Sequence, residues 1–251
     1  MTTAILSALP EEQAGLAQRL DGLRTQVYAG REFHVGRWQG REVVFVLSRI
    51  GKVAAATTAA AAIERFGATR LFFTGLAGGL HPDVRVGDTV IGGEFLQHDM
   101  DASPLFARHE VPLYGRARFA ADASSVALLL AAAQAAPEGG GLEPEVRQRF
   151  GLGRASRLHR GLIVSGDRFV SRAHEAQALR EQLPDALAVD MEAAAVAQVC
   201  HDHGVPFAAA RHVSDRADDE AHVDFPAYLA QVAACQARGL ITALLDRLPA
   251  P

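Results

Sequence analysis

Acidic side chains recur where an apolar, strand-like run of this sequence ends. In "AVDMEAAAVA" (188–197), Asp190 and Glu192 flank Met191 at the point where a strand pattern becomes an alanine-rich helix pattern. Carboxylates are rarely buried without a partner. Two explanations are open: an ordinary helix start, where the helix dipole favours negative charge by ~0.3–1 kcal/mol, or a ligand that carries hydroxyl groups. The same two explanations are open for Glu12 in "SALPEEQ", which also lies at the start of an expected helix.

A third carboxylate has a different setting. Asp215, in "ARHVSDRADD", directly follows an apolar strand pattern that also contains Arg211, and it comes just after Ser214, whose hydroxyl can donate to it. A carboxylic acid held in this way could deliver a proton to a leaving group. Phe169, in "SGDRFV", is an ordinary core residue by default, but an aromatic face at a strand end could also stack on a purine ring.

A glycine-rich turn lies at another strand end. "TGLAGGL" contains Leu76 and Gly78, and its glycines would allow the backbone to approach a ligand closely. The spacing is not that of a dinucleotide-binding G-x-G-x-x-G loop. Together, the carboxylates, the aromatic ring and the arginine suit a small ligand with hydroxyl groups and a heteroaromatic ring.

The composition limits the class of protein. A chain of 251 residues, 49% hydrophobic and 22% charged, can bury one large core. The net charge of -4, without a basic stripe, argues against nucleic acid as a partner. No apolar run reaches the ~18 residues of a membrane span. Two cysteines and an N-terminus without a signal pattern predict a cytoplasmic protein, and no histidine or cysteine spacing predicts a metal site.

Strand patterns alternate with helix patterns along the chain. We therefore predict one α/β domain over residues 1–251, with a central mixed sheet flanked by helices on both faces. Expected strands cover 3–9, 32–38, 41–50, 70–80, 85–96, 159–170, 186–191 and 206–215, and expected helices cover 10–20, 52–66, 124–135, 172–182, 192–204 and 225–247. Residues 136–157, rich in glycine, proline and arginine, are expected to form a flexible surface insertion. Sheets of this kind bind ligands at the carboxyl ends of their strands, where the candidate residues fall.

Seven blocks, in order, carry a family resemblance. They are "SALPEE", "SRIGKVAAATTA", "TGLAGGL", "VGDTVIGGEFLQHDMDAS", "GLIVSGDRFV", "AVDMEAAAVAQVC" and "RHVSDRAD". The chain resembles the nucleoside phosphorylase/hydrolase superfamily, and most closely the 5'-methylthioadenosine/S-adenosylhomocysteine nucleosidases, over nearly its whole length except 136–157. The resemblance implies hydrolysis of the N-glycosidic bond of 5'-thio-substituted adenosines, with release of adenine and without a cofactor or metal.

The resemblance also implies roles for the polar residues. Glu12, helped by Arg211, would hold and deprotonate the attacking water. Glu192 would hydrogen-bond the ribose hydroxyls, with Met191 packed against the sugar. Asp215, oriented by Ser214, would donate a proton toward N7 of adenine.

For the rest of the nucleoside, the resemblance implies apolar and backbone contacts. Phe169 would stack on the base, and the backbone of Val170 would read its edge. The pocket for the 5'-alkylthio group would be lined by Leu9, Ile50 and Phe225. A homodimer is implied as well, with a loop at 102–114 that reaches the partner's pocket.

Two positions depart from the family pattern. Asp190 stands where relatives often have glutamate, and its shorter side chain suggests a secondary role. Leu76 stands where the family often has serine near the water and the sugar. Glu12 and Arg211 would then position the water alone, which puts the rate and the substrate range in question.

Three alternatives stay open at this point. A phosphorolytic relative would need arginines around the phosphate, whereas the loops here carry Glu12 and "GLAGG", so that Arg49 is the one residue in its favour. Another hydrolase of the superfamily could act on AMP or futalosine, although the predicted 5' pocket is apolar. A catalytically silent nucleoside-binding protein is the third. The preferred 5' substituent is not decided.

Overall fold

One mixed sheet organises the molecule. The structure is a computed structural model that describes residues 1–13, 15–136, 142–152 and 156–249. Ten strands pair in the described part, in the order β10-β6-β8-β9-β5-β1-β4-β3-β2, with β7 beside β6. Their bounds are β1 Thr2–Ser7, β2 Asp21–Tyr28, β3 Arg31–Trp38, β4 Arg41–Leu47, β5 Ala68–Gly79, β6 Thr89–Gln97, β7 Arg118–Ala120, β8 Leu158–Ser165, β9 Ala186–Asp190 and β10 Phe207–Asp215. A further pairing of β10 with β5 closes β5, β10, β6, β8 and β9 into a ring.

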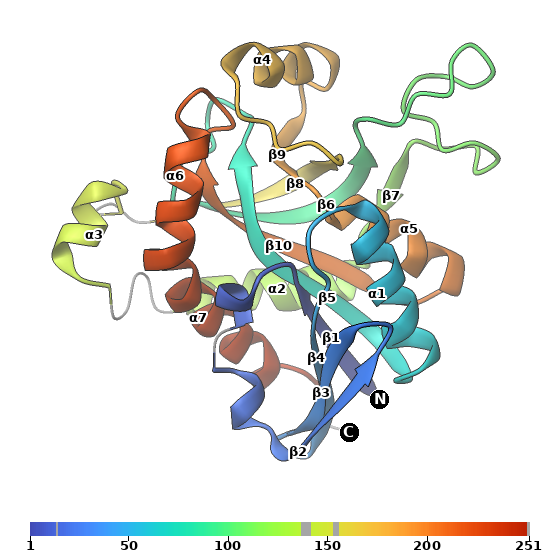
Figure 1. The fold of residues 1–251 in the computed structure, drawn as a ribbon, viewed down its shortest axis with the longest axis vertical. Helices are drawn as coiled ribbons and strands as arrows, with labels where there is room; N and C mark the ends of the chain where they lie inside the picture. The colour runs from blue at the N-terminus through green and yellow to red at the C-terminus, as the bar shows by residue number, and fades with distance from the viewer. Residues whose placement is uncertain (14, 137–141, 153–155, 250–251) are drawn as a thin grey trace.

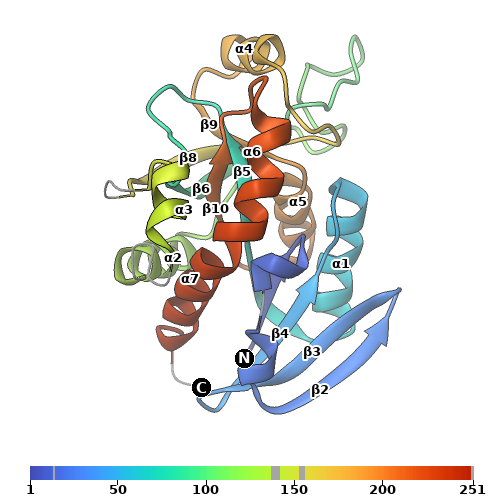
Figure 2. The same ribbon diagram turned by 60° about the vertical axis from the view of Figure 1, so that its left-hand side comes forward.

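Helices cover both faces of the sheet, as Figures 1 and 2 show. They are α1 Lys52–Glu64, α2 Ala123–Ala135, α3 Pro144–Arg149, α4 Ala173–Gln182, α5 Ala193–His203, α6 Ala221–Tyr228 and α7 Ala234–Asp246, with a π-helical segment, η3 Leu229–Ala233, between the last two. One core cluster includes buried residues of α1 and α5, and another includes those of α2 and α7. The predicted single α/β domain with a mixed sheet flanked on both faces is therefore confirmed.

The element bounds differ from the predicted ones near the N-terminus. The helix expected over 10–20 is replaced by two short 3-10 helices, η1 Pro10–Gln13 and η2 Ala17–Arg19. The side chain of Gln13 donates to the carbonyl oxygens of Ile5 and Val46, at 3.0 and 3.2 Å, and so ties this segment to the sheet. The three-residue strand β7 was not predicted, and neither was strand β2. All side chains of β2 are exposed, so it lacks the alternation of buried and exposed residues that marks a strand in a sequence.

The segment 136–157 contains a short helix, α3, in its described part. Phe150 at the end of α3 is buried, and its ring meets that of Tyr228 with centroids 5.1 Å apart. Leu76 belongs to the same apolar cluster. Residues 137–141 and 153–155 lie outside the described residues, and the flexibility of this insertion stays a prediction.

Candidate active site

A cavity of about 390 Å³ lies at the carboxyl ends of β1, β5, β9 and β10. Of the fourteen predicted site residues, twelve line it: Leu9, Glu12, Ile50, Leu76, Gly78, Phe169, Val170, Asp190, Met191, Glu192, Asp215 and Phe225. The other two, Arg211 and Ser214, contact carboxylates of this group directly. The structure therefore brings residues from distant parts of the sequence into one place.

Glu12 is held by backbone amides. Its Oε2 accepts from the N–H groups of Ala8 and Leu9, at 2.8 and 2.9 Å, and its Oε1 accepts from that of Leu76 at 3.0 Å. Burial raises the pKa of Glu12, while Arg211 and the three amides oppose that shift. The side chain of Leu76 has no hydroxyl group, but its backbone amide orients the carboxylate.

Glu12 and Arg211 converge on a glycine of β5. A Cβ atom at Gly75 would lie 2.7 Å from Oε1 of Glu12 and 2.8 Å from Nη1 of Arg211. Real Cβ atoms essentially never come that close to another atom. A larger residue at position 75 would therefore force Glu12 or Arg211 to move.

Asp190 fixes Arg211 and the start of α5. Its Oδ2 accepts from Nε of Arg211 at 2.7 Å, and its Oδ1 accepts from the hydroxyl of Ser165 at 2.5 Å. The amide of Ala193, in the first turn of α5, also points at this carboxylate, 3.3 Å from Oδ1. Arg211 and Asp190 are both buried, so the pair neutralises two charges that water does not reach.

Glu192 lies between this pair and the loop before α1. Its Oε1 accepts from the amide of Gly51 at 3.1 Å, and its Oε2 lies 3.6 Å from Nη2 of Arg211. Burial and the neighbouring Asp190 raise the pKa of Glu192, and Arg211 lowers it. This carboxyl group faces the cavity and can hydrogen-bond a ligand whether or not it carries a proton.

Asp215 occupies another side of the cavity. Its Oδ2 accepts from the hydroxyl of Ser214 and its Oδ1 from the amide of Ala217, both at 2.8 Å. Burial raises the pKa of Asp215 to about 6. A Cβ atom at Gly78 would lie 3.0 Å from Oδ1. Asp215 can therefore hold a proton near neutral pH, next to a glycine that leaves room for a ligand.

The apolar part of the cavity includes two aromatic rings. Phe169 and Phe225 lie with their centroids 5.6 Å apart and their planes tilted by 60°. Phe169 is 40% exposed and Ile50 is 50% exposed, although both line the cavity. An aromatic ring that is only partly covered by its own chain can stack on the flat face of a ligand.

Some residues of the site were not predicted from the sequence. Arg168 lines the cavity and forms an ion pair with Glu175 of α4. Ser165 donates a hydrogen bond to Asp190, and the amide of Gly51 donates one to Glu192. Both residues lie in sequence blocks that carry the family resemblance. Their position at or just after a strand end was the signal that could have found them.

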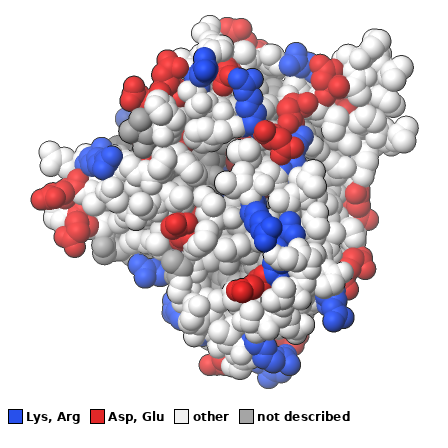
Figure 3. All heavy atoms as spheres, in the orientation of Figure 1, with Lys and Arg blue, Asp and Glu red and all other residues white. Residues whose placement is uncertain are grey.

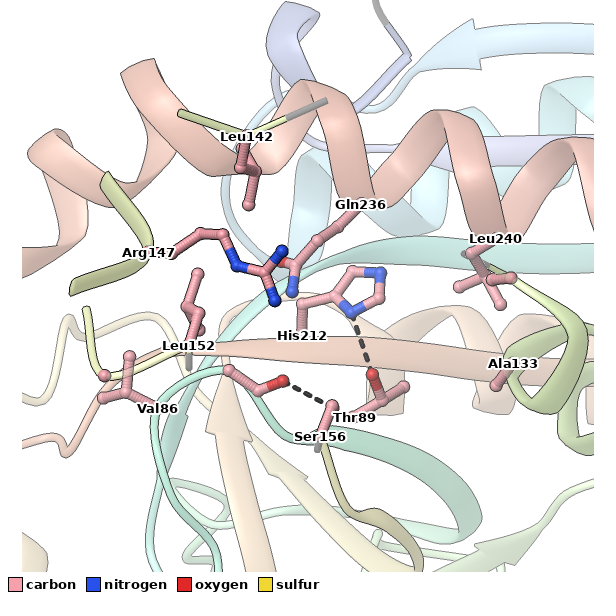
Figure 4. Close-up of a pocket in the computed structure, with 13 residues that line it drawn as sticks. Val86, Thr89, Ala133, Leu142, Arg147, Leu152, Ser156, His212, Gln236 and Leu240 are labelled. Atoms are coloured by element: carbon pink, nitrogen blue, oxygen red, sulfur yellow. Dashed lines mark hydrogen bonds between the residues drawn. The ribbon is translucent and has the colours of Figure 1, made fainter. Parts of the chain in front are cut away.

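A second cavity, shown in Figure 4, is much smaller, at about 80 Å³. His212 is the buried titratable residue on its wall, and its Nδ1 pairs with the hydroxyl of Thr89 at 3.0 Å. Burial and the neighbouring Arg211 lower the pKa of His212 to about 4, which keeps the ring neutral. No carboxylate is among the described residues that line this cavity, so the acid–base chemistry belongs to the larger one.

The described residues also bear on metal, membrane and nucleic-acid binding. They contain no group of three or more histidine, cysteine, aspartate or glutamate residues placed to bind a metal ion. Their helices include none that is long and apolar enough to cross a bilayer. On the face shown in Figure 3, acidic and basic side chains of the described residues are interspersed, without a continuous basic stripe.

Comparisons with known proteins agree with this geometry. A family model described as the phosphorylase superfamily matches residues 2–246. A 5'-methylthioadenosine/S-adenosylhomocysteine nucleosidase of Geobacillus thermodenitrificans is 39% identical over 246 residues, which are 98% of this chain and 96% of the relative. The chain therefore belongs to the phosphorylase superfamily and, within it, to the family of 5'-methylthioadenosine/S-adenosylhomocysteine nucleosidases.

Solved structures give the same result. The nucleosidase of Streptococcus pneumoniae with the transition-state inhibitor MT-ImmA superposes with a TM-score of 0.84 at 32% identity, covering 99% of this chain and 100% of that one. A futalosine hydrolase of Helicobacter pylori superposes with a TM-score of 0.83 at 29% identity, covering 99% and 98% of the two chains. The fold is thus shared by hydrolases named for different substrates, and the side chains of the cavity have to distinguish them.

Proposed function

We propose that this protein hydrolyses the N-glycosidic bond of 5'-thio-substituted adenosines, such as methylthioadenosine and adenosylhomocysteine, and releases adenine. The observation that carries the proposal is the placement of Glu12, Glu192 and Asp215 around one cavity that also has an apolar part. Relatives at 39% identity are named for this activity. A nucleoside needs this combination, because its sugar is polar while its base and thioether are mostly apolar.

Each carboxylate has a separate part in the proposed reaction. Asp215 gives its proton to N7 of adenine, so that the bond between N9 and C1' breaks and adenine leaves as a neutral base. Positive charge develops on the sugar, and the nearby Glu192 stabilises it while binding the ribose hydroxyls. Water adds to C1' and gives its proton to Glu12, which Arg211 keeps oriented.

The base and the 5' group are bound by the apolar residues. Phe169 stacks on adenine, the backbone of Val170 contacts its edge, and Met191 packs against the sugar. Leu9, Ile50 and Phe225 surround the 5'-alkylthio group. An AMP-type substrate would bring a phosphate into this apolar part, which disfavours it.

Phosphorolysis is less well supported than hydrolysis. Arg168, which lines the cavity, is paired with Glu175, and Arg211, which contacts the carboxylates of the site, is paired with Asp190. Arg49, which could have favoured phosphate, instead donates to the carbonyl of Gly30 at 2.5 Å. Glu12 would also repel a phosphate dianion at the position of the nucleophile.

We further propose that the protein is a homodimer in the cytoplasm. The loop at 102–114 carries Leu105 and Leu113, which are 83% and 92% exposed. A partner subunit would bury these two apolar side chains, and the loop would reach the partner's pocket. The cytoplasmic location rests on the sequence features described above.

The experiment that tests the function is release of the purine base from four substrates. Purified protein is incubated with methylthioadenosine, adenosylhomocysteine, futalosine or AMP, and adenine or the corresponding base is quantified by chromatography. We expect turnover of the two thio-substituted adenosines. Turnover of futalosine or AMP alone would contradict the proposed substrate class, and no turnover of any substrate would support a silent binding protein.

A further inference from the structure

The loop before α1 holds the carboxylate that we assign to the ribose. The amide of Gly51 donates to Oε1 of Glu192 at 3.1 Å. Gly51 has a φ of 99°, in the region that favours glycine, and a Cβ atom there would lie 3.2 Å from Oδ1 of Asp167. The direction of this amide therefore depends on how the loop is fixed.

Lys52, the next residue, is fixed at both its backbone and its side chain. Its amide donates to Oδ1 of Asp167 at 2.7 Å. Its Nζ donates to Oδ1 of Asp99 at 2.6 Å and to Oε1 of Gln97 at 3.0 Å. The amide of Asp167 donates to Oδ2 of Asp99 at 2.9 Å, which closes the network.

This network, the Lys52 clamp (Lys52, Asp99 and Asp167), is more than an exposed ion pair. The side chains of Lys52 and Asp99 are only 15% and 32% exposed. Burial would raise the pKa of Asp99, but the hydrogen bonds from Lys52 and from the amide of Asp167 hold it below its usual value. Charge-assisted bonds of this kind are shorter and stronger than neutral ones.

The choice of lysine at this position is unusual for this chain. Lys52 is the single lysine of the sequence, beside 24 arginines. An ammonium group presents three donors from one point, whereas a guanidinium presents a planar fork. Here one nitrogen atom, Nζ of Lys52, donates to two oxygens, Oδ1 of Asp99 and Oε1 of Gln97.

We propose that Lys52 is a positioning residue that, through Asp99 and Asp167, fixes the amide of Gly51 on Glu192 and so orients the ribose-binding carboxylate. This inference rests on the proposed function. Lys52 is not among the described residues that line the cavity, and so its effect passes through Gly51 and Glu192.

The test compares two substrates. In Lys52→Gln, we expect kcat for methylthioadenosine to fall by about tenfold or more, with a smaller change in KM, because the contact to the ribose strengthens in the transition state. The 2',3'-dideoxy analogue lacks the hydroxyls that Glu192 would bind. With this analogue, the same substitution should lower kcat by a much smaller factor. A merely structural role would lower both rates by the same factor.

Two matched variants complete this test. Arg65→Gln removes one positive charge from the other end of α1, where the side chain is exposed, and should behave like the wild type. Asp99→Asn should reproduce the effect of Lys52→Gln, and the double variant should be no worse than either single one. Equal losses for both substrates, or an unchanged kcat in Lys52→Gln, would overturn the inference.

A measurement without turnover separates this inference from the proposed function. Isotope-labelled lysine gives one Nζ resonance in this chain, and in the wild type its exchange with solvent should be slow. In Asp99→Asn, exchange should become fast, and fast exchange already in the wild type would refute the clamp. Slow exchange in a wild type that releases no adenine would leave the clamp intact and refute the proposed function.

Discussion

At the scale of the residue, the three carboxylates of the cavity differ because their surroundings differ. Glu12 accepts hydrogen bonds from three backbone amides, whereas Asp215 accepts one from a hydroxyl group and one from a backbone amide. Glu192 lies close to another carboxylate, that of Asp190. Burial raises the pKa of all three groups, but their hydrogen-bond partners and neighbouring charges differ. These differences support one role for each residue.

Replacing Asp215 by Asn should remove the proton donor without disturbing the fold. We expect kcat for adenine release to fall by about 10²–10⁴-fold, which is the usual contribution of a general acid. The rate is measured by chromatography, with circular dichroism as the check on folding. Equal, substantial rates in the wild type and in a folded Asp215→Asn variant would refute the acid role.

The same substitution should change the pH dependence of stability. The pKa of Asp215 is raised to about 6 in the folded protein, so the folded state binds this proton more tightly than the unfolded state. Stability from this group is present at pH 4 and lost as the pH rises through 6. Asp215→Asn should therefore be more stable than the wild type at pH 8, by roughly 1–3 kcal/mol, and similar to it near pH 4.

Urea unfolding at the two pH values measures this difference. Ser214→Ala leaves the carboxyl group but removes a hydrogen bond that lowers the pKa of Asp215, and so should keep or strengthen the pH dependence of the wild type. A difference between Asp215→Asn and the wild type that is the same at pH 4 and pH 8 would contradict the raised pKa.

At the scale of the element, η1 places Glu12 and β10 places Arg211, and Gly75 of β5 leaves room for the two charged groups to meet. In Gly75→Ala, the new methyl group would lie within 3 Å of both Glu12 and Arg211. We expect adenine release to fall by at least tenfold, because Glu12 must move. Gly93→Ala on β6 is the control, since its Cβ would have no neighbour closer than 3.6 Å, and it should keep nearly full activity.

The sequence predicts the buried elements better than the exposed ones. Strands β5, β6, β8, β9 and β10 and the helices α2, α4 and α5 follow from apolar periodicity, whereas the short elements β7 and α3 were not predicted. Strand β2 has no buried face and leaves no pattern. The segment 10–20 has a helix-like composition, but hydrogen bonds from the side chain of Gln13 and to the carboxylate of Glu12 hold it in short 3-10 turns instead.

Candidate residues could likewise be predicted where a strand end marks them. Asp215 and Glu192 come at or just after the ends of apolar strands, and both line the cavity. The link between Asp190 and Arg211 could not be predicted, because it depends on how β9 and β10 lie in the closed ring of strands. The Lys52 clamp could not be predicted either, because Asp99 and Asp167 are distant from Lys52 in the sequence.

At the scale of the whole molecule, the loop at 102–114 should decide the oligomeric state. Leu105→Asp should shift the protein from dimer to monomer in sedimentation experiments and lower adenine release, because a charge at an apolar interface is costly. Val27→Asp, at a 73% exposed position on β2, is the matched control and should stay dimeric. A wild type that is monomeric would contradict the proposed dimer.

The choice of water as the nucleophile is the central claim, and the mass of the sugar product tests it most directly. The reaction is run with methylthioadenosine in H₂¹⁸O, with and without phosphate, and the products are analysed by mass spectrometry. We predict equal rates with and without phosphate, and a free 5-methylthioribose that contains one ¹⁸O atom. A product that forms only when phosphate is present, and that is a sugar 1-phosphate, would contradict the account.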